Sequence, residues 1–243
     1  MDEYTSPLLA EPATTGNLSD IIVDNAVQAP HKVVFKRRAG ERWLDVTCSE
    51  FLSQVQGVAK GLMAAGVRPG DRVALMSKTR YEWTLIDFAI WCAGGVTVPI
   101  YETSSAEQVQ WILSDSAAVA CLVETPDHLA VVEEVRGDLG KLDHLWVIDT
   151  GAVDELTAAG REIDDKELET RRTTAKPSDL ATIIYTSAPR DGRRVASSPT
   201  ATSSSRRPTS SARRTATRRW PTSSGTRVPR RCSSSRWPMC SPG

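Results

Sequence analysis

The stretch RVALMSKTRYEWTLIDFAIWCAGGVTVPI, residues 72–100, decides the fold of this chain. Residues 73–76 and 96–100 are largely apolar and predict two buried strands. Residues 81–92 lie between them and predict a helix that is apolar, and therefore buried, on most of its faces. Gly94 and Gly95 end this helix before the second strand begins. This order of strand, helix and strand is typical of a parallel sheet.

The same alternation continues on both sides of this stretch. Toward the N-terminus, residues 47–50 form a capping box that begins a helix, and residues 33–46 predict a hairpin. Toward the C-terminus the pattern predicts helices over 105–114 and 126–139, strands over 118–123, 145–148 and 180–185, and a charged, solvated excursion over 162–174. We therefore predict an α/β fold with a layered, mostly parallel sheet, preceded by a flexible arm over residues 1–17.

The composition changes abruptly between Ser187 and Ala188. The 56 residues that follow contain 13 Arg, 13 Ser, 7 Thr and 7 Pro, and they contain no Lys, Leu, Ile, Phe or Tyr. Their net charge is +12, whereas that of residues 1–187 is −12, so the formal neutrality of the whole chain is accidental. A segment with so little apolar material cannot offset the entropy of ordering, and we predict that residues 188–243 are disordered.

The break falls within a motif that resembles the phosphate-binding loop of adenylate-forming enzymes. Residues 183–187 read IIYTS, and in those enzymes the loop continues Gly-Thr-Thr-Gly-x-Pro-Lys-Gly, whereas here residues 188–194 read APRDGRR. Glycines let backbone N–H groups approach a phosphate, and the lysine adds positive charge. Taken alone, Thr186 and Ser187 are more simply interpreted as polar residues that end a strand.

A one-nucleotide deletion explains the break. When residues 188–202 are back-translated and one G is inserted before the Ala188 codon, the codons regroup as Gly-Thr-Thr-Gly-Arg-Pro-Lys-Gly and then Cys-Val-Leu-Thr-His-Arg-Asn. All 15 consecutive codons permit this family-like string. We interpret residues 188–243 as an out-of-frame product, arising from a real deletion or from a sequencing error.

Residues 81–91 and 94–108 resemble actinobacterial long-chain fatty acid–CoA ligases, and the resemblance spans roughly residues 18–187. It implies the N-terminal part of the large domain of an adenylate-forming enzyme. It also implies a reaction in which ATP and a fatty acid give acyl-adenylate and pyrophosphate, after which coenzyme A displaces AMP. ATP, Mg and coenzyme A are thus the implied cofactors.

The resemblance assigns site residues only at the loop. Tyr185, Thr186 and Ser187 match the beginning of the ATP phosphate loop, and no catalytic or metal-binding residue can be matched. The family's adenine-binding motif, its Mg-binding acid, its ribose-binding aspartate and its catalytic lysine all follow the loop. We therefore expect a truncated ligase that is inactive as written and binds none of its cofactors productively.

Another class of function is an acidic α/β module with an Arg/Ser-rich tail that binds nucleic acid. The absence of Lys and the presence of only two aromatic residues in the tail argue against it, and shifted GC-rich codons produce the same composition.

No apolar run approaches the length of a membrane span, which leaves peripheral membrane contact as an option. The spacing of the cysteines predicts no metal site, and Cys92 and Cys121 are predicted to be core thiols. The N-terminal residues do not have the pattern of a signal peptide. We therefore expect a cytoplasmic location.

Overall fold

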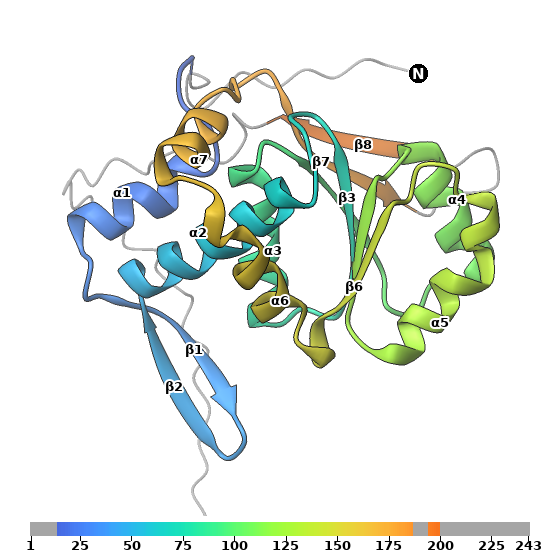
Figure 1. The fold of residues 1–243 in the computed structure, drawn as a ribbon, viewed down its shortest axis with the longest axis horizontal. Coiled ribbons are helices and arrows are strands. Elements are labelled where there is room, and N and C mark those ends of the chain that lie inside the picture. The colour runs from blue at the N-terminus through green and yellow to red at the C-terminus, as the bar shows by residue number, and fades with distance from the viewer. Residues whose placement is uncertain (1–13, 187–193, 200–243) are drawn as a thin grey trace, which may run out of the picture. The chain divides into compact units, whose positions relative to one another are not determined.

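The structure, a computed structural model, describes residues 14–186 and 194–199 (Figure 1). Most of the predicted arm therefore lies outside the described residues. The main sheet has six strands in the order β6-β5-β3-β4-β7-β8. These are β3 (Arg72–Met76), β4 (Val96–Ile100), β5 (Ala120–Val123), β6 (His144–Val147), β7 (Leu180–Thr186) and β8 (Arg194–Pro199). The strands from β6 to β7 pair in parallel, which confirms the predicted α/β fold.

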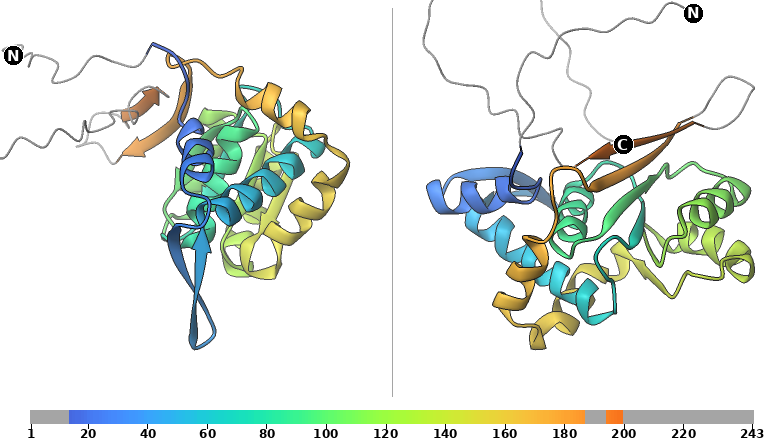
Figure 2. Two further views of the ribbon diagram at one scale, coloured as in Figure 1. Left: turned by 90° about the vertical axis from the view of Figure 1, so that its left-hand side faces the viewer. Right: turned by 90° about the horizontal axis from the view of Figure 1, so that it is seen from above.

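Helices cover both faces of the sheet and form a three-layer arrangement (Figure 2). One face packs against α2 (Cys48–Ala64), α3 (Tyr81–Cys92) and α6 (Ala152–Ala159), with α1 (Asp20–Gln28) and α7 (Asp165–Arg172) contributing at the margin of the same core. The other face packs against α4 (Ala106–Ser116) and α5 (Pro126–Val135). Three single turns of 3-10 helix, η1 (Arg136–Asp138), η2 (Ile148–Thr150) and η3 (Gly160–Glu162), follow α5, β6 and α6 in the chain.

Local signals in the sequence account for the helix starts and the buried positions. Glu50 N donates to Thr47 Oγ1 at 3.3 Å and Thr47 N donates to Glu50 Oε2 at 2.8 Å, which confirms the capping box of α2. The apolar helix α3 is buried against α2 and the sheet, as its composition predicts. Cys92 and Cys121 are buried, and burial raises the pKa of each thiol to about 12, so both are unreactive core thiols.

A separate two-stranded sheet precedes α2 in the chain. Strands β1 (Val33–Ala39) and β2 (Arg42–Thr47) pair antiparallel, which confirms the predicted hairpin. Phe35 on its inner face contacts Phe51 and Tyr81 at ring-centroid distances of 4.8 and 5.7 Å. These ring contacts attach the base of the hairpin to the core.

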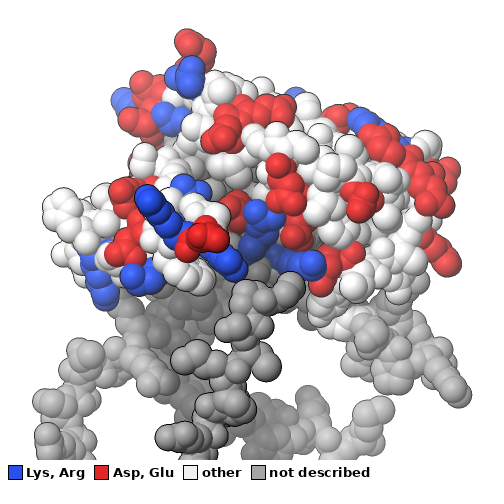
Figure 3. Space-filling model, turned by 90° about the horizontal axis from the view of Figure 1, so that it is seen from below, with Lys and Arg blue, Asp and Glu red and all other residues white. Residues whose placement is uncertain are grey.

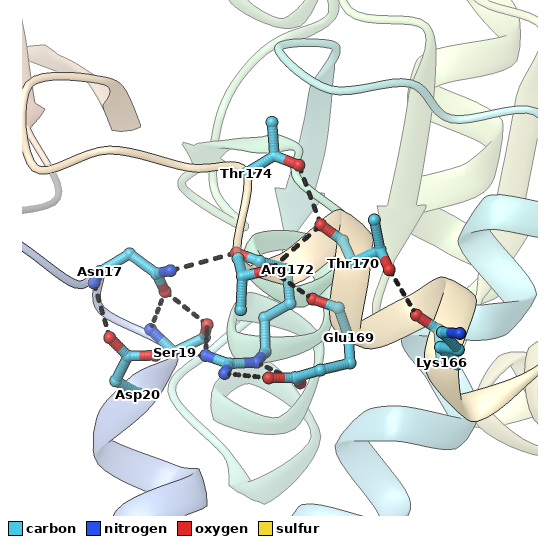
Figure 4. Close-up of polar contacts among 9 residues, drawn as sticks. Asn17, Ser19, Asp20, Lys166, Glu169, Thr170, Arg172 and Thr174 are labelled. Carbon is cyan, nitrogen blue, oxygen red and sulfur yellow. Dashed lines mark hydrogen bonds and ion pairs between the residues drawn. The ribbon is translucent and has the colours of Figure 1, made fainter.

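Residues 162–174 are mostly exposed, as their charge predicts, but they include helix α7 with a buried arginine (Figure 4). The Arg172 side chain is only 8% exposed. Its guanidinium pairs with Asp20, donates to Ser19 Oγ at 3.1 Å, and donates twice to Glu169 at 2.7 and 2.8 Å. A charged group can be buried when its donors are paired. This network joins α7 to the start of α1, and Asn17 extends it by donating to the Arg172 carbonyl.

Strand β8 differs from the sequence-based expectation. Residues 188–243 were predicted to be disordered, which would leave β7 as an open edge, whereas residues 194–199 pair antiparallel with β7 from Leu180↔Pro199 to Thr186↔Arg194. Pairing at a sheet edge uses backbone N–H and C=O groups and needs no particular side chains. The rest of the segment lies outside the described residues.

Asp87 on α3 provides a test of the packing between this helix and β4. Its residue exposure is 7%, and neither its Oδ1 nor Thr97 Oγ1 of β4 has a hydrogen-bond partner within residues 14–186 and 194–199. Burial raises the pKa of Asp87 to about 6. The folded state therefore binds this proton more tightly than the unfolded chain does. The resulting stability is present below about pH 4 and is lost as the pH rises through about 6.

We expect Asp87→Asn to remove this loss. The unfolding free energy of the variant relative to the parent should rise by about 2 kcal/mol between pH 4.5 and pH 7.5, in the range that linkage allows for such a shift. Urea unfolding of both proteins across this pH range measures the difference. Parallel stability profiles for the two proteins would show that the Asp87 carboxylate is hydrated rather than buried.

Candidate functional site

The carboxyl ends of the parallel strands lie along one edge of the sheet. Strand β4 lies on one side of β3 and β5 lies on the other, so the strand order reverses between β3 and β5. Ligands of open α/β sheets bind outside the carboxyl ends of the strands, usually at such a reversal. This edge, from the end of β6 to the end of β7, is therefore where the fold predicts a ligand site.

Glu124, directly after β5, fills the reversal point. Its residue exposure is 9%. Its carboxylate accepts from Lys78 N at 2.9 Å and from Ser77 Oγ at 3.4 Å, both just after β3, and lies 3.6 Å from Arg80 Nη1. These bonds join the ends of β3 and β5, so the Glu124 carboxylate is already engaged within the fold.

Two more carboxylates converge on the same arginine. Arg80 pairs with Asp149, after β6, at 2.6 Å and with Glu82, on α3, at 2.7 Å. Burial opposes the charge of Arg80, but the hydrogen bonds to these two acids outweigh it and raise its pKa. With Glu124, three acids surround one guanidinium, and the excess negative charge disfavours a phosphate here. Sequence reasoning missed this network, although a single acid directly after an apolar strand is a signal that marks Glu124.

Tyr185 lies near the carboxyl end of β7 and is anchored within the fold. Its residue exposure is 9%, its hydroxyl donates to Asp115 Oδ2 on α4 at 2.7 Å, and its ring packs edge-on against Trp111 at a centroid distance of 5.1 Å. Burial, together with the Asp115 carboxylate, raises the pKa of Tyr185, so the phenol stays protonated and keeps donating. Asp115 is therefore a positioning residue for the end of β7, and sequence reasoning did not identify it.

The predicted site residues are only partly within the described structure. Tyr185 and Thr186 are consecutive on β7, and because side chains alternate along a strand, Tyr185 points into the core while Thr186 is exposed at the end of the strand. Ser187 and the residues up to 193 lie outside the described residues. Strand β8 follows them in the chain and pairs antiparallel with β7.

The described residues contain no metal centre and no membrane span. In residues 14–186 and 194–199, no group of three or more His, Cys, Asp or Glu side chains is placed to hold a metal ion. None of the helices in these residues is long and apolar enough to cross a bilayer.

A pocket of about 750 Å³ lined by Trp91, Arg171 and Asp179 lies at the amino ends of β3, β4 and β7, the edge opposite to the candidate site.

The chain is similar to known ligases in sequence and in fold. Residues 22–188 match the family model described as AMP-binding enzyme. The long-chain-fatty-acid–CoA ligase FadD15 of Mycobacterium bovis is 44% identical over 182 residues, which cover 72% of this chain and 30% of that protein. The FadD15 protein of Mycobacterium tuberculosis is 43% identical over the same length.

Two solved structures share the fold at low sequence identity. The crystal structure of VinN has a TM-score of 0.64 at 20% identity and covers 79% of this chain and 47% of that one. The crystal structure of the long-chain-fatty-acid-CoA ligase FadD1 from Archaeoglobus fulgidus has a TM-score of 0.62 at 21% identity, covering 76% of this chain and 36% of that one.

The match to the family ends where the composition changes. The family model stops at residue 188, one residue beyond Ser187, and the chain spans about 30% of the length of its FadD15 relatives. The matched part corresponds to the parallel sheet, its helices and the end of β7. The chain therefore belongs to the AMP-binding enzyme family, of which it carries an N-terminal part.

Proposed function

We propose that this chain is part of a long-chain fatty acid–CoA ligase that uses ATP and coenzyme A. The observation that carries the proposal is that the match to the AMP-binding enzyme family stops at the end of β7, on the carboxyl edge of the sheet, in a chain that is 44% identical to FadD15 over 182 residues. A loop at this edge is where α/β enzymes hold phosphates. The neighbouring reversal point is filled by carboxylates, which favours β7 over β3 as the phosphate position.

In this proposal Thr186 and Ser187 face the ATP phosphates, and Tyr185 holds the strand end that presents them. The bond between Tyr185 and Asp115 supports the second role, because the tyrosine hydroxyl is already used within the fold. Magnesium bound with ATP would neutralise part of the triphosphate charge. No metal ligand is assigned to this chain.

We also propose that the chain as written is inactive. Residues 188–194 replace the loop glycines with Ala188, Pro189, Arg190 and Asp191. Pro189 lacks a backbone N–H, and Asp191 adds a negative charge beside the phosphates. The nucleic-acid-binding alternative depends on the tail over residues 188–243, of which only 194–199 are among the described residues, and we propose no specific nucleic acid as a partner.

We expect this enzyme to work in the cytoplasm and to meet its substrate at a membrane surface. A long-chain fatty acid partitions into lipid because each buried methylene contributes about 0.8 kcal/mol. Peripheral contact with the bilayer would bring the ligase to this pool of substrate without a membrane span.

Insertion of one G before the Ala188 codon tests the proposed function. The repaired gene should yield a protein that releases pyrophosphate from ATP and Mg²⁺ only when palmitate is present, and that forms palmitoyl-CoA once coenzyme A is added. Acetate in place of palmitate is the control for chain length. If the repaired protein turns over neither acid, the assignment to the fatty acid ligases is wrong.

A further inference from the structure

The N-terminal hairpin and the helix before it carry an unusual share of the exposed apolar side chains. Nine large hydrophobic residues are exposed among those described, and six of them lie between residues 21 and 44. These are Ile21, Val27, Val33, Val34, Trp43 and Leu44. Trp43 is 66% exposed and Val27 is 76% exposed. Exposed apolar residues concentrated in one segment indicate an interaction surface.

The strand register places Trp43 beside basic side chains on the outer face of the hairpin. Arg38 is directly opposite Trp43, and Lys36 is opposite Asp45 two positions along the same face. Phe35 and Val46 are opposite each other on the inner face, which packs on the core. The outer face therefore combines a 66% exposed indole with Arg38 and with a Lys36–Asp45 ion pair of 2.6 Å.

The charge of the hairpin is opposite to that of the rest of the fold. Residues 32–47 contain five basic and two acidic residues, whereas residues 48–186 contain 12 basic and 22 acidic residues. Figure 3 shows the molecule from below, the direction in which the hairpin points in Figure 1, and its basic side chains gather mainly in the left-hand half while the right-hand side is mainly acidic. An anionic partner is attracted by the hairpin and repelled by most of the remaining surface.

We propose that the β1–β2 hairpin, with the exposed side of α1, docks on an anionic lipid surface. Lipid head groups supply the negative charge, and the region beneath them accepts Trp43 and Val34, as is usual for indole and aliphatic side chains next to Lys and Arg at a bilayer interface. A nucleic acid would satisfy the basic residues but leave Val27 and Val34 in water. A second copy of the chain would bring two hairpins of net charge +3 together.

This inference names the surface for the membrane contact in the proposed function, but lipid binding does not depend on ligase chemistry. A chain that binds vesicles without turning over palmitate would support the docking surface and leave the ligase assignment to its own test. A repaired ligase that turns over palmitate but never binds vesicles would support the ligase assignment and contradict the docking surface. The two proposals can therefore fail separately.

Co-sedimentation with vesicles at physiological ionic strength tests the charged part of the surface. The vesicles contain phosphatidylcholine with or without phosphatidylglycerol. We expect Lys36→Glu combined with Arg38→Glu, both on the outer face, to weaken partitioning onto the anionic vesicles at least about tenfold, since each basic residue near such a surface contributes about 1 kcal/mol. The matched control, Arg161→Glu with Lys166→Glu, makes the same change in net charge on exposed residues of η3 and α7. Both the control variant and the hairpin variant retain the Arg-rich tail.

Quenching of tryptophan fluorescence by brominated phosphatidylcholine tests insertion. Trp43→Phe keeps an aromatic side chain, so binding should persist while the quenched fraction of the fluorescence falls. Tyr101→Ser removes an exposed aromatic residue elsewhere and should change neither signal. Equal loss of binding in both charge-reversed proteins, or unchanged quenching in Trp43→Phe, would overturn the proposal. A dimer without vesicles that only the hairpin variant dissociates would assign the surface to a second copy instead.

Discussion

The chain as written will release no pyrophosphate above background from ATP, Mg²⁺ and palmitate, whereas the repaired chain will. The carboxylate and the triphosphate are both anionic, so attack at the α-phosphorus depends on donors that are positioned before the reaction. Losing one such donor costs on the order of a hundredfold in rate. Residues 188–194 replace several donors at once, and Asp191 adds repulsion.

A loop graft separates the loss of the loop from the loss of the sequence after it. Residues 188–195 are replaced by Gly-Thr-Thr-Gly-Arg-Pro-Lys-Gly, and residues 196–243 stay as they are. We expect the graft to bind ATP more tightly than the parent by calorimetry and still to release no pyrophosphate, because the in-frame sequence after the loop is absent. Turnover by the unrepaired parent above a heat-inactivated sample would contradict the proposed inactivity.

Gly61→Ala will destabilise the fold by about 3 kcal/mol, in the range that overpacking of a core costs. Helices α2 and α6 approach so closely that a Cβ at Gly61 would lie 2.1 Å from the Leu156 carbonyl oxygen and 2.5 Å from its carbon. Gly160 completes this contact, because a Cβ there would lie 2.5 Å from Gly61 N. Backbone atoms cannot rotate away as a side chain can, so the two helices must separate. The gain of about 1 kcal/mol in helix propensity does not offset this.

Gly57→Ala is the matched control on the same helix. A Cβ at Gly57 would meet only the Thr157 side chain, at 3.0 Å from Cγ2 and 3.2 Å from Oγ1, and that side chain can change rotamer. Both substitutions make the same change in helix propensity, so the difference between their unfolding free energies in urea isolates the backbone clash. Equal stabilities for the two variants would show that α2 and α6 do not pack at this distance.

The amino-acid sequence by itself determined the class of the fold and the position at which the family match ends. Apolar runs of strand length alternate with helical periods from residue 72 onward, and the structure has strands and helices in that order. The capping box at Thr47 and the buried helix α3 were also predictable, because each depends on residues close together in the chain. The change of composition after Ser187 coincides with the end of the family match.

Only the tertiary structure decided which distant residues meet. The order of the strands brings Glu124 to Arg80, and the packing of α7 brings Arg172 to Asp20, 152 residues away in the chain. Asp115 and Tyr185 are 70 residues apart. The charge of residues 162–174 predicted their exposure but not the burial of Arg172, because a local pattern does not reveal that Ser19 and Asp20 at the start of α1 meet its guanidinium.

The pairing of β8 with β7 was likewise decided by the tertiary structure. The composition of residues 194–199 predicts no strand, but the edge of β7 offers unpaired backbone groups to whatever segment returns beside it. Side-chain periodicity reports burial and element type, since both follow from local hydrophobic area. Strand order, close helix contacts and buried ion pairs depend on the three-dimensional arrangement of segments that are far apart in the chain, and no local pattern encodes them.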